Sequence, residues 1–288
     1  MAPFFKALVV CPTWKRPNCI KKWLYQIAKT TDLNQYAVAV INNGGDAETR
    51  RIVSDYLGSY RGVCYLETNR NVGIPAALNL GIQNFSESEQ FLVTTEDDAF
   101  IFTPGWLDKL IAIHKNNPQI GLILTEHYQD RILEQTVIEN PRVAERITYV
   151  DENVLGQVKF FNRNFKDQFG YFREDYGLYG FEDSDMCYRV HFAGLQIATV
   201  SKSIVNCCHG RVDEEGKFLA PIGDKIPDGG IEKQIENGLA DENTLPKGHA
   251  KLMRFRHLYA KSKNLTKLEY PASSDAFVTV RTYQRYYE

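Results

Sequence analysis

The fold is decided by residues 63–94, where two kinds of hydrophobic pattern follow one another. The stretch opens with Val63-Cys-Tyr-Leu-Glu67, continues with Pro75-Ala-Ala-Leu-Asn-Leu-Gly-Ile-Gln-Asn-Phe85 and closes with Gln90-Phe-Leu-Val-Thr94. The two short apolar runs favour buried strands, and the middle run has the spacing of an amphipathic helix. A strand, a helix and a second strand in this order predict a parallel βαβ unit.

The same alternation extends outward from this unit in both directions. Further strands are expected at Lys6–Cys11 (ended by Pro12), Ala37–Ile41, Gly121–Leu124, Val158–Asn162 and Gln196–Val200, and further helices at Asn18–Lys29, Ala47–Leu57, Pro104–Lys115 and Ser184–Ala193. We therefore predict an α/β fold, with a Rossmann-like, mostly parallel sheet flanked by helices. Ligands of such sheets bind at the carboxyl ends of the strands.

Composition excludes several protein classes. The chain has 288 residues, a formal net charge of −2 and 43% hydrophobic residues, as expected of a folded globular protein. Apolar runs such as Tyr36–Ile41 are far too short to span a membrane, and the first residues read as a strand and not as a signal peptide. Six cysteines without a Cys-x-x-Cys pair favour free thiols over disulfides or structural zinc. We therefore expect a cytoplasmic protein without a membrane span.

The strongest chemical signal is an acidic triplet at the end of a strand. In Gln90-Phe-Leu-Val-Thr-Thr-Glu-Asp-Asp-Ala-Phe-Ile-Phe102, the acids Glu96, Asp97 and Asp98 stand between apolar segments. In an extended chain Glu96 and Asp98 would share one face and Asp97 the other. Two carboxylates on one face are natural ligands for a hard divalent cation, and a solvated acidic turn is the alternative.

Two more segments carry candidate residues. The glycine-aromatic segment Tyr176-Gly-Leu-Tyr-Gly-Phe-Glu-Asp-Ser-Asp-Met186 places Glu182 and Asp183 just before an expected helix, with Ser184 as its N-cap. A carboxylate beside an aromatic wall can act as a general base, and helix capping is the alternative. In Ile204-Val-Asn-Cys-Cys-His-Gly210, His209 follows an apolar strand at an expected turn, where it could complete a metal site or be structural.

Taken in order, these segments resemble the family-2 glycosyltransferases of the GT-A fold. The resemblance covers about residues 6–210. It rests on Cys11-Pro-Thr-Trp-Lys-Arg-Pro17, Val40-Ile-Asn-Asn-Gly-Gly-Asp46, Asn71-Val-Gly-Ile-Pro-Ala-Ala-Leu-Asn-Leu-Gly81, the acidic triplet, Gly180-Phe-Glu-Asp183 and His209. The third of these segments matches an Asn-x-Gly-x-x-x-Ala-x-Asn-x-Gly signature and is the most specific.

The resemblance implies a role for each candidate residue. The donor is expected to be a nucleotide-sugar, first of all a UDP-sugar. It would be bound by Pro12, Thr13, Arg16, Asn42, Asn71, Gly73, Asn79 and Asp97. Asp98, Glu96 and His209 would hold Mn²⁺ or Mg²⁺ on the diphosphate. Asp183 would deprotonate the acceptor hydroxyl for inverting transfer, and Glu182 would bind the acceptor. Asn42 and Glu96 each stand where the family commonly has Asp.

The resemblance also implies a division of the chain. Residues 1–210 would form the GT-A catalytic domain, with a nucleotide-sugar half at 1–100 and an acceptor half at 101–210. Residues 211–288 would form an irregular and helical extension. Its stretch 247–267 holds seven Lys or Arg residues and no acid, which indicates either a solvated helix face or a site for a phosphate-bearing acceptor such as hydroxylated DNA.

Two other functions remain open on the sequence. A sugar-phosphate nucleotidyltransferase would need a glycine-rich loop after the first strand, and Cys11–Pro17 contains no glycine. A non-catalytic protein of the same fold that binds glycans or nucleotide-sugars would have no use for two intact acidic motifs, whose like charges repel. The acceptor, whether a glycan or another hydroxyl compound, is not specified by these motifs.

Overall fold

A nine-stranded sheet forms the centre of the protein. The computed structural model describes residues 5–86, 90–125, 137–138, 157–174, 182–212, 218–221 and 280–283. Across the sheet the strands are, in order, β12 (Val280–Tyr283), β3 (Val63–Thr68), β2 (Ala37–Asn42), β1 (Ala7–Thr13), β4 (Phe91–Thr95), β8 (Val158–Arg163), β6 (Ile120–Thr125), β9 (Gln196–Val200) and β7 (Val137–Ile138). Strands β3, β2, β1 and β4 are parallel, and β8 runs antiparallel between β4 and β6.

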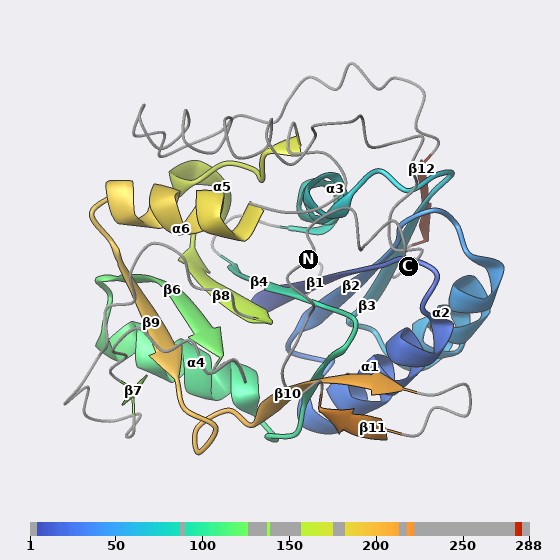
Figure 1. Cartoon of the computed structure of the whole chain (residues 1–288), viewed down its shortest axis with the longest axis horizontal. Helices are drawn as coiled ribbons and strands as arrows, with labels where there is room; N and C mark the ends of the chain where they lie inside the picture. Colours follow the sequence, from blue (N-terminus) through green and yellow to red (C-terminus); the bar gives the residue numbers. More distant parts are fainter. Residues whose placement is uncertain are drawn as a thin grey trace.

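Helices cover both faces of this sheet (Figure 1). One face is covered by α1 (Pro17–Thr30), α2 (Ala47–Ser59) and α4 (Trp106–Asn116), and the other by α3 (Ile74–Phe85), α5 (Phe165–Gln168) and α6 (Glu182–Phe192). Each face has its own apolar core, the first around Trp23 and Trp106 and the second around Phe161 and Phe172. The central strands read as continuous apolar runs because both of their faces are buried.

The order of the strands creates a switch point between β1 and β4. From β1 the chain moves outward through β2 to β3, and it then returns to the other side of β1 as β4. The connections therefore leave the carboxyl ends of β1 and β4 in opposite directions. In open α/β sheets the crevice at such a point is the usual ligand site.

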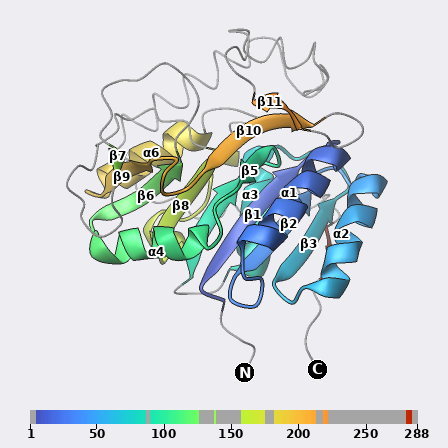
Figure 2. The same ribbon diagram turned by 90° about the horizontal axis from the view of Figure 1, so that it is seen from below.

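A second, three-stranded sheet lies at the carboxyl ends of the parallel strands. It consists of β11 (Phe218–Pro221), β10 (Cys207–Val212) and β5 (Ala99–Ile101), which follows β4. Figure 2 shows β10 and β11 at the end of the molecule opposite the N-terminus, where β1 begins. The segment after β4 and the segment around His209 are therefore brought to one edge.

The expected α/β fold is confirmed, with two local corrections. Strand β1 continues through Pro12 to Thr13 and does not end at Pro12. The missing N–H is tolerated there because β4 pairs with β1 only as far as Val10. Helix α6 begins at Glu182, so Ser184 lies inside the helix and is not its N-cap.

The expected C-terminal extension is described in part. Strand β11 pairs with β10 and β12 pairs with β3, so two strands from beyond residue 210 join the strands of the catalytic range. The basic stretch 247–267 lies outside the described residues, and the division at residue 210 stays a prediction. All six cysteines are free thiols. None of the described helices combines the length and the apolarity that a membrane crossing requires.

Candidate active site

The switch point between β1 and β4 holds four polar side chains in direct contact. The hydroxyl of Thr13, at the end of β1, donates a hydrogen bond to Asp97 Oδ2 at 2.6 Å. Nη1 of Arg16, the N-cap residue of α1, lies 3.0 Å from Asp97 Oδ1 and 2.8 Å from Asp98 Oδ2. One guanidinium therefore joins both aspartates, and the opening motif and the acidic triplet form one site.

Because this cluster is buried, its charged groups interact more strongly than they would in water. Asp97 and Asp98 are only 4% and 6% exposed. Burial and the neighbouring Asp98 raise the pKa of Asp97, although Arg16 and Thr13 oppose this shift. The charge of Asp97 in turn raises the pKa of Arg16, which stays a cation at any physiological pH. Removing Arg16 would leave two adjacent buried carboxylates without the cation that lies between them.

The acidic triplet forms a turn and not the extended segment that the sequence suggested. The N–H of Ala99 donates to the carbonyl oxygen of Glu96 at 3.2 Å, which closes a turn through Asp97 and Asp98. Both aspartates consequently face Arg16, and the expected alternation, with Asp97 on the opposite face, is wrong. The N–H of Glu96 donates to Gln157 at 3.3 Å, which ties the turn to the start of β8.

Strand β10 places His209 beside this turn. His209 lies within the strand, paired with Ala99, and the N–H of Gly210 donates to the carbonyl oxygen of Asp98 at 3.0 Å. The expected turn at His209 is therefore a strand, but its backbone is adjacent to the acidic triplet. The side chain of His209 lies outside the part of the structure that is described.

In the second acidic motif, Asp183 forms an ion pair with a lysine that the sequence analysis did not identify. Asp183, in the first turn of α6, lies with its Oδ1 3.0 Å from Nζ of Lys159 on β8. The two side chains are 14% and 8% exposed, so the pair is largely removed from water. Burial alone would lower the pKa of Lys159, but Asp183, Glu96 and Glu182 raise it above its ordinary value. Lys159 is therefore a fixed positive charge among three carboxylates.

The other acid of this motif is Glu182. It is 7% exposed, and its Oε2 has no hydrogen-bond partner among the described residues. Burial, followed by the charge of Asp183, raises the pKa of Glu182 to about 7. Near neutral pH this side chain can therefore hold a proton and donate a hydrogen bond.

A buried ion pair within α6 connects this helix to the segment that follows α5. Arg189 Nη2 lies 2.6 Å from Asp185 Oδ2, and Arg189 Nη1 donates to the carbonyl oxygens of Phe169 and Tyr171. Because all four hydrogen-bonding groups are satisfied together, the orientation of the helix and of its first turn is restricted.

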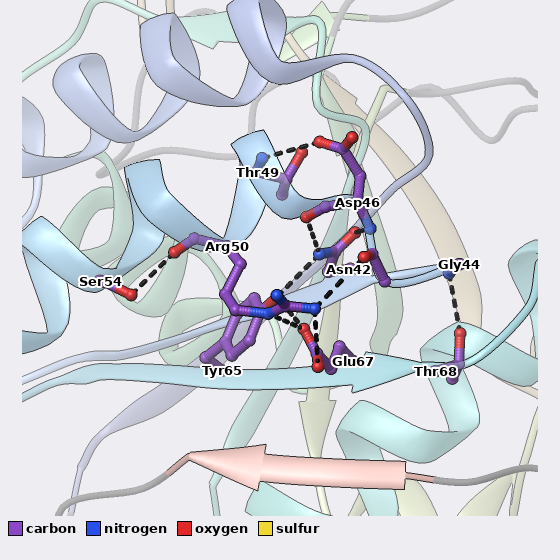
Figure 3. Close-up of polar contacts among 10 residues, drawn as sticks. Asn42, Gly44, Asp46, Thr49, Arg50, Ser54, Tyr65, Glu67 and Thr68 are labelled. Carbon is purple, nitrogen blue, oxygen red and sulfur yellow. Dashed lines mark hydrogen bonds and ion pairs between the residues drawn. The ribbon is translucent and has the colours of Figure 1, made fainter.

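At the carboxyl ends of β2 and β3, Asn42 belongs to a buried hydrogen-bond network (Figure 3). Its amide nitrogen donates to the carbonyl oxygen of Asp46 at 2.8 Å and to the hydroxyl of Tyr65 at 2.7 Å, and its Oδ1 accepts from the N–H of Asp46. Tyr65 donates to Glu67, which is paired with Arg50 at 2.7 Å. Asn42 is fully buried, and its side chain holds the turn after β2.

The loop before α3 is organised by two asparagines. Asn71 Oδ1 accepts from the N–H of Gly73 at 2.9 Å and from the amide of Asn43 at 2.8 Å, and Asn43 Oδ1 accepts from Val72. Gly73 has φ +91°, a backbone conformation that favours glycine. Asn79 is fully buried, and its amide donates to the carbonyl oxygen of Phe172. The signature at 71–81 therefore builds a rigid loop and anchors the helix.

The donor atoms at the switch point suit a hard divalent cation. Carboxylate oxygens of Asp98 and Glu96 are the ligand type that Mg²⁺ and Mn²⁺ prefer, and one or two carboxylates suffice when substrate phosphates complete the shell. Among the residues with described positions, no group of three or more His, Cys, Asp or Glu side chains is arranged to hold a metal ion. The carboxylates of the acidic triplet have the donor chemistry for a cation whose remaining ligands are substrate phosphates.

Two of these site residues were missed on the sequence. Lys159 is a single charge in the apolar run Val158-Lys-Phe-Phe161, and a buried lysine in such a run requires an acidic partner. The sequence around Lys159 could therefore have indicated a buried ion pair. Asn43 gave no separate signal, because its contacts with Asn71 and Val72 depend on how two loops meet.

Comparison with known protein families matches residues 8–176 to the model described as glycosyl transferase family 2. The matched range is more than half of the chain. The chain belongs to glycosyl transferase family 2. The resemblance to this family that the motifs indicated is therefore confirmed. No curated protein matches it in sequence.

Solved glycosyltransferase structures share the fold of this family-2 member. TarS from S. aureus in complex with UDP has 17% identity and a TM-score of 0.54, over 68% of this chain and 58% of that chain. The mannosyltransferase PcManGT from Pyrobaculum calidifontis, with GDP-Man and Mn²⁺, has 14% identity and a TM-score of 0.54, over 91% and 74%. GalNAc-T7 with UDP, GalNAc and Mn²⁺ has 13% identity and a TM-score of 0.58, over 88% and 55%. These likenesses establish the GT-A fold.

The family-2 chain is shorter than several of these relatives. It spans 35% of one TarS chain and 58% of a shorter form, residues 1–349.

Proposed function

We propose that this protein moves a sugar from a nucleoside diphosphate sugar to a hydroxyl group of an acceptor. The observation that carries the proposal is the position of the two acidic motifs. Asp97 and Asp98 lie at the switch point of the sheet, where a nucleotide ligand is expected. Asp183, in the first turn of α6, is paired with Lys159 on β8, the strand next to β4. The structures of TarS with UDP and of PcManGT with GDP-Man support such a donor.

The donor would lie across the carboxyl ends of β1 and β2. Pro12, Thr13 and Arg16 would bind the nucleotide, together with Asp97, and the loop from Asn71 to Gly73 would line the cleft. Asn42 and Asn79 are buried and hydrogen-bonded, so we place them behind the cleft, where they hold its walls. The side chain of Asn42 is thereby removed from direct reading of the base.

A divalent cation, Mn²⁺ or Mg²⁺, would be held by Asp98 and Glu96, with His209 as a further ligand. When bound, such a cation supplies positive charge that stabilises the leaving diphosphate. The complexes of PcManGT and GalNAc-T7 with Mn²⁺ support this assignment.

Asp183 would act as the general base. It takes the proton of the acceptor hydroxyl while the hydroxyl oxygen forms a bond to the anomeric carbon, and the bond from that carbon to the diphosphate oxygen breaks. The nucleoside diphosphate leaves, and attack from the opposite side inverts the anomeric carbon. Glu182, when protonated, would donate a hydrogen bond to the acceptor. The acceptor would be a glycan hydroxyl or a phosphate-bearing polymer bound through residues 247–267.

Calorimetric titration with a panel of UDP- and GDP-sugars, with and without Mn²⁺, tests this function. Wild type should bind one donor in a metal-dependent way, and Asp98→Ala should weaken that binding at least about tenfold, or about 1.4 kcal/mol. The matched control is Asp55→Ala, an exposed carboxylate on α2 that should bind like wild type. Absence of binding to every donor, with every metal, would contradict the proposal and favour a glycan-binding protein of this fold.

A further inference from the structure

The inference concerns Lys159 and rests on the proposed function. Strand β8 runs antiparallel to β4, so its first residues lie at the edge where the parallel strands end. Lys159 pairs with Thr94 on one side and with Leu124 on the other, in the interior of the sheet. The backbone of Lys159 is therefore held on both sides by neighbouring strands, close to the end of β4 where the acidic triplet begins.

This lysine contacts one of two adjacent carboxylates. Its Nζ lies 3.0 Å from Asp183 Oδ1, and no hydrogen bond reaches Glu182 Oε2 from the described residues. Among the described residues, Lys159 interacts electrostatically with Asp183 and Glu182 of α6 and with Glu96 of the turn after β4, and Glu182 interacts with the other three groups. A buried ammonium stabilises the negative charge on the carboxylate that it touches, and a buried carboxylate without a donor favours its neutral form.

We propose that Lys159 determines which of the two adjacent carboxylates is the base, by binding and orienting the carboxylate of Asp183 while Glu182 serves to bind the acceptor. The ammonium fixes Oδ1 of Asp183 and leaves Oδ2 to take the proton of the acceptor hydroxyl. The raised pKa of Glu182 agrees with this division of roles. Lys159 does not touch the reacting atoms, so it is a positioning residue.

The test is the pH dependence of sugar transfer in Lys159→Met, with Lys159→Arg as the conservative variant. In Lys159→Met, kcat at pH 7 should fall about 10- to 100-fold, a part of the usual contribution of a general base. The KM for the donor should stay within about twofold, and the acid limb of the kcat profile should move to higher pH, because Asp183 and Glu182 then compete for one proton. Lys159→Arg keeps the charge and should restore the position of the acid limb.

Two further measurements distinguish a positioning role of Lys159 from a purely structural one: the donor binding of Lys159→Met and the activity of a double variant. Lys159→Met should bind the donor as wild type does, which shows that the fold and the donor site are intact. Asp183→Asn should be almost inactive, and adding Lys159→Met to it should cause no further loss, since both changes act on one group. The double variant also removes both partners of the buried pair and therefore keeps the comparison valid if Lys159→Met alone is unstable.

The outcomes separate this inference from the proposed function. If wild type turns over no donor, the proposed function fails and the role of Lys159 fails with it. If wild type is active and Asp183→Asn is inactive, but Lys159→Met has the wild-type profile, only the role of Lys159 is overturned. A further loss on adding Lys159→Met to Asp183→Asn, as large as in wild type, would likewise overturn it.

Discussion

At the scale of single residues, the carboxylate of Glu182 connects the chemistry of the site to the stability of the protein. Its pKa is raised from 4.5 to about 7 by burial and by Asp183. The folded state therefore favours the protonated form, and the stabilisation that this gives is complete below pH 4.5 and is lost as the pH rises through 7. At 1.36 kcal/mol per pKa unit, the loss amounts to about 3 kcal/mol above pH 8.

Glu182→Gln should remove this pH dependence. The free energy of unfolding of the variant, relative to wild type, should increase by about 2 to 3 kcal/mol between pH 5 and pH 8, because the neutral amide does not ionise. Denaturant unfolding at both pH values measures the difference. Asp55→Asn on α2, which replaces one exposed carboxylate by an amide, is the matched control. A flat difference for Glu182→Gln would mean that Glu182 stays ionised in the folded protein.

At the scale of elements, the site depends on how closely α3 lies on the sheet. A Cβ at Gly81 would stand 2.5 Å from Val10 Cγ1 and 3.1 Å from Ile41 Cδ1. Glycine therefore allows the helix to approach β1 and β2, and the loop from Asn71 to Gly73 is carried at the start of that helix. A second residue of the signature, Asn79, ties the same helix to Phe172.

Gly81→Ala should destabilise the protein although alanine is the better helix former. The expected loss is about 1–3 kcal/mol, because overpacking outweighs a gain of about 1 kcal/mol in helix propensity. Gly58→Ala is the matched control: it lies in α2, with no atom within 4 Å of the added Cβ, and should stabilise by about 0.5 kcal/mol. Thermal and denaturant unfolding of both variants decide the point. Equal effects at the two positions would show that α3 can move away from the sheet at no cost.

At the scale of the whole molecule, the two expected halves, residues 1–100 and 101–210, share one sheet. Strand β8 pairs with β4 on one side and with β6 on the other, so separating the halves breaks a continuous ladder. The first apolar core also contains Trp23 of α1 and Trp106 of α4, and Trp106 Nε1 donates to Thr31 at 2.9 Å. Two sequence ranges of different expected function thus form one structural unit.

This continuity predicts one cooperative unfolding event for the sheet. In native-state hydrogen exchange, the slowest amides of β1 and of β6 should report the same opening free energy, within about 1 kcal/mol. A donor bound at the end of β1 should raise both values by the same amount, because it binds only the folded state. Exchange of β6 and β9 through an opening several kcal/mol below that of β1 would show that the halves unfold separately.

The sequence by itself determined the order and type of the elements and the place of the acidic motifs. Strand and helix periodicity is local, and polar residues after an apolar strand mark its carboxyl end wherever the strand lies in the sheet. The order of the motifs within residues 6–210 was also sufficient to indicate the family, which the family model confirms.

The tertiary structure alone decided which of these residues meet and in what state. Arg16 and Asp97 are 81 positions apart, and Lys159 reaches Asp183 only because β8 enters the sheet in the reverse direction. The turn through Asp98 overrides the alternation that an extended chain would have. The protonation of Glu182 depends on burial, which is produced by segments from across the chain, and no local pattern encodes it.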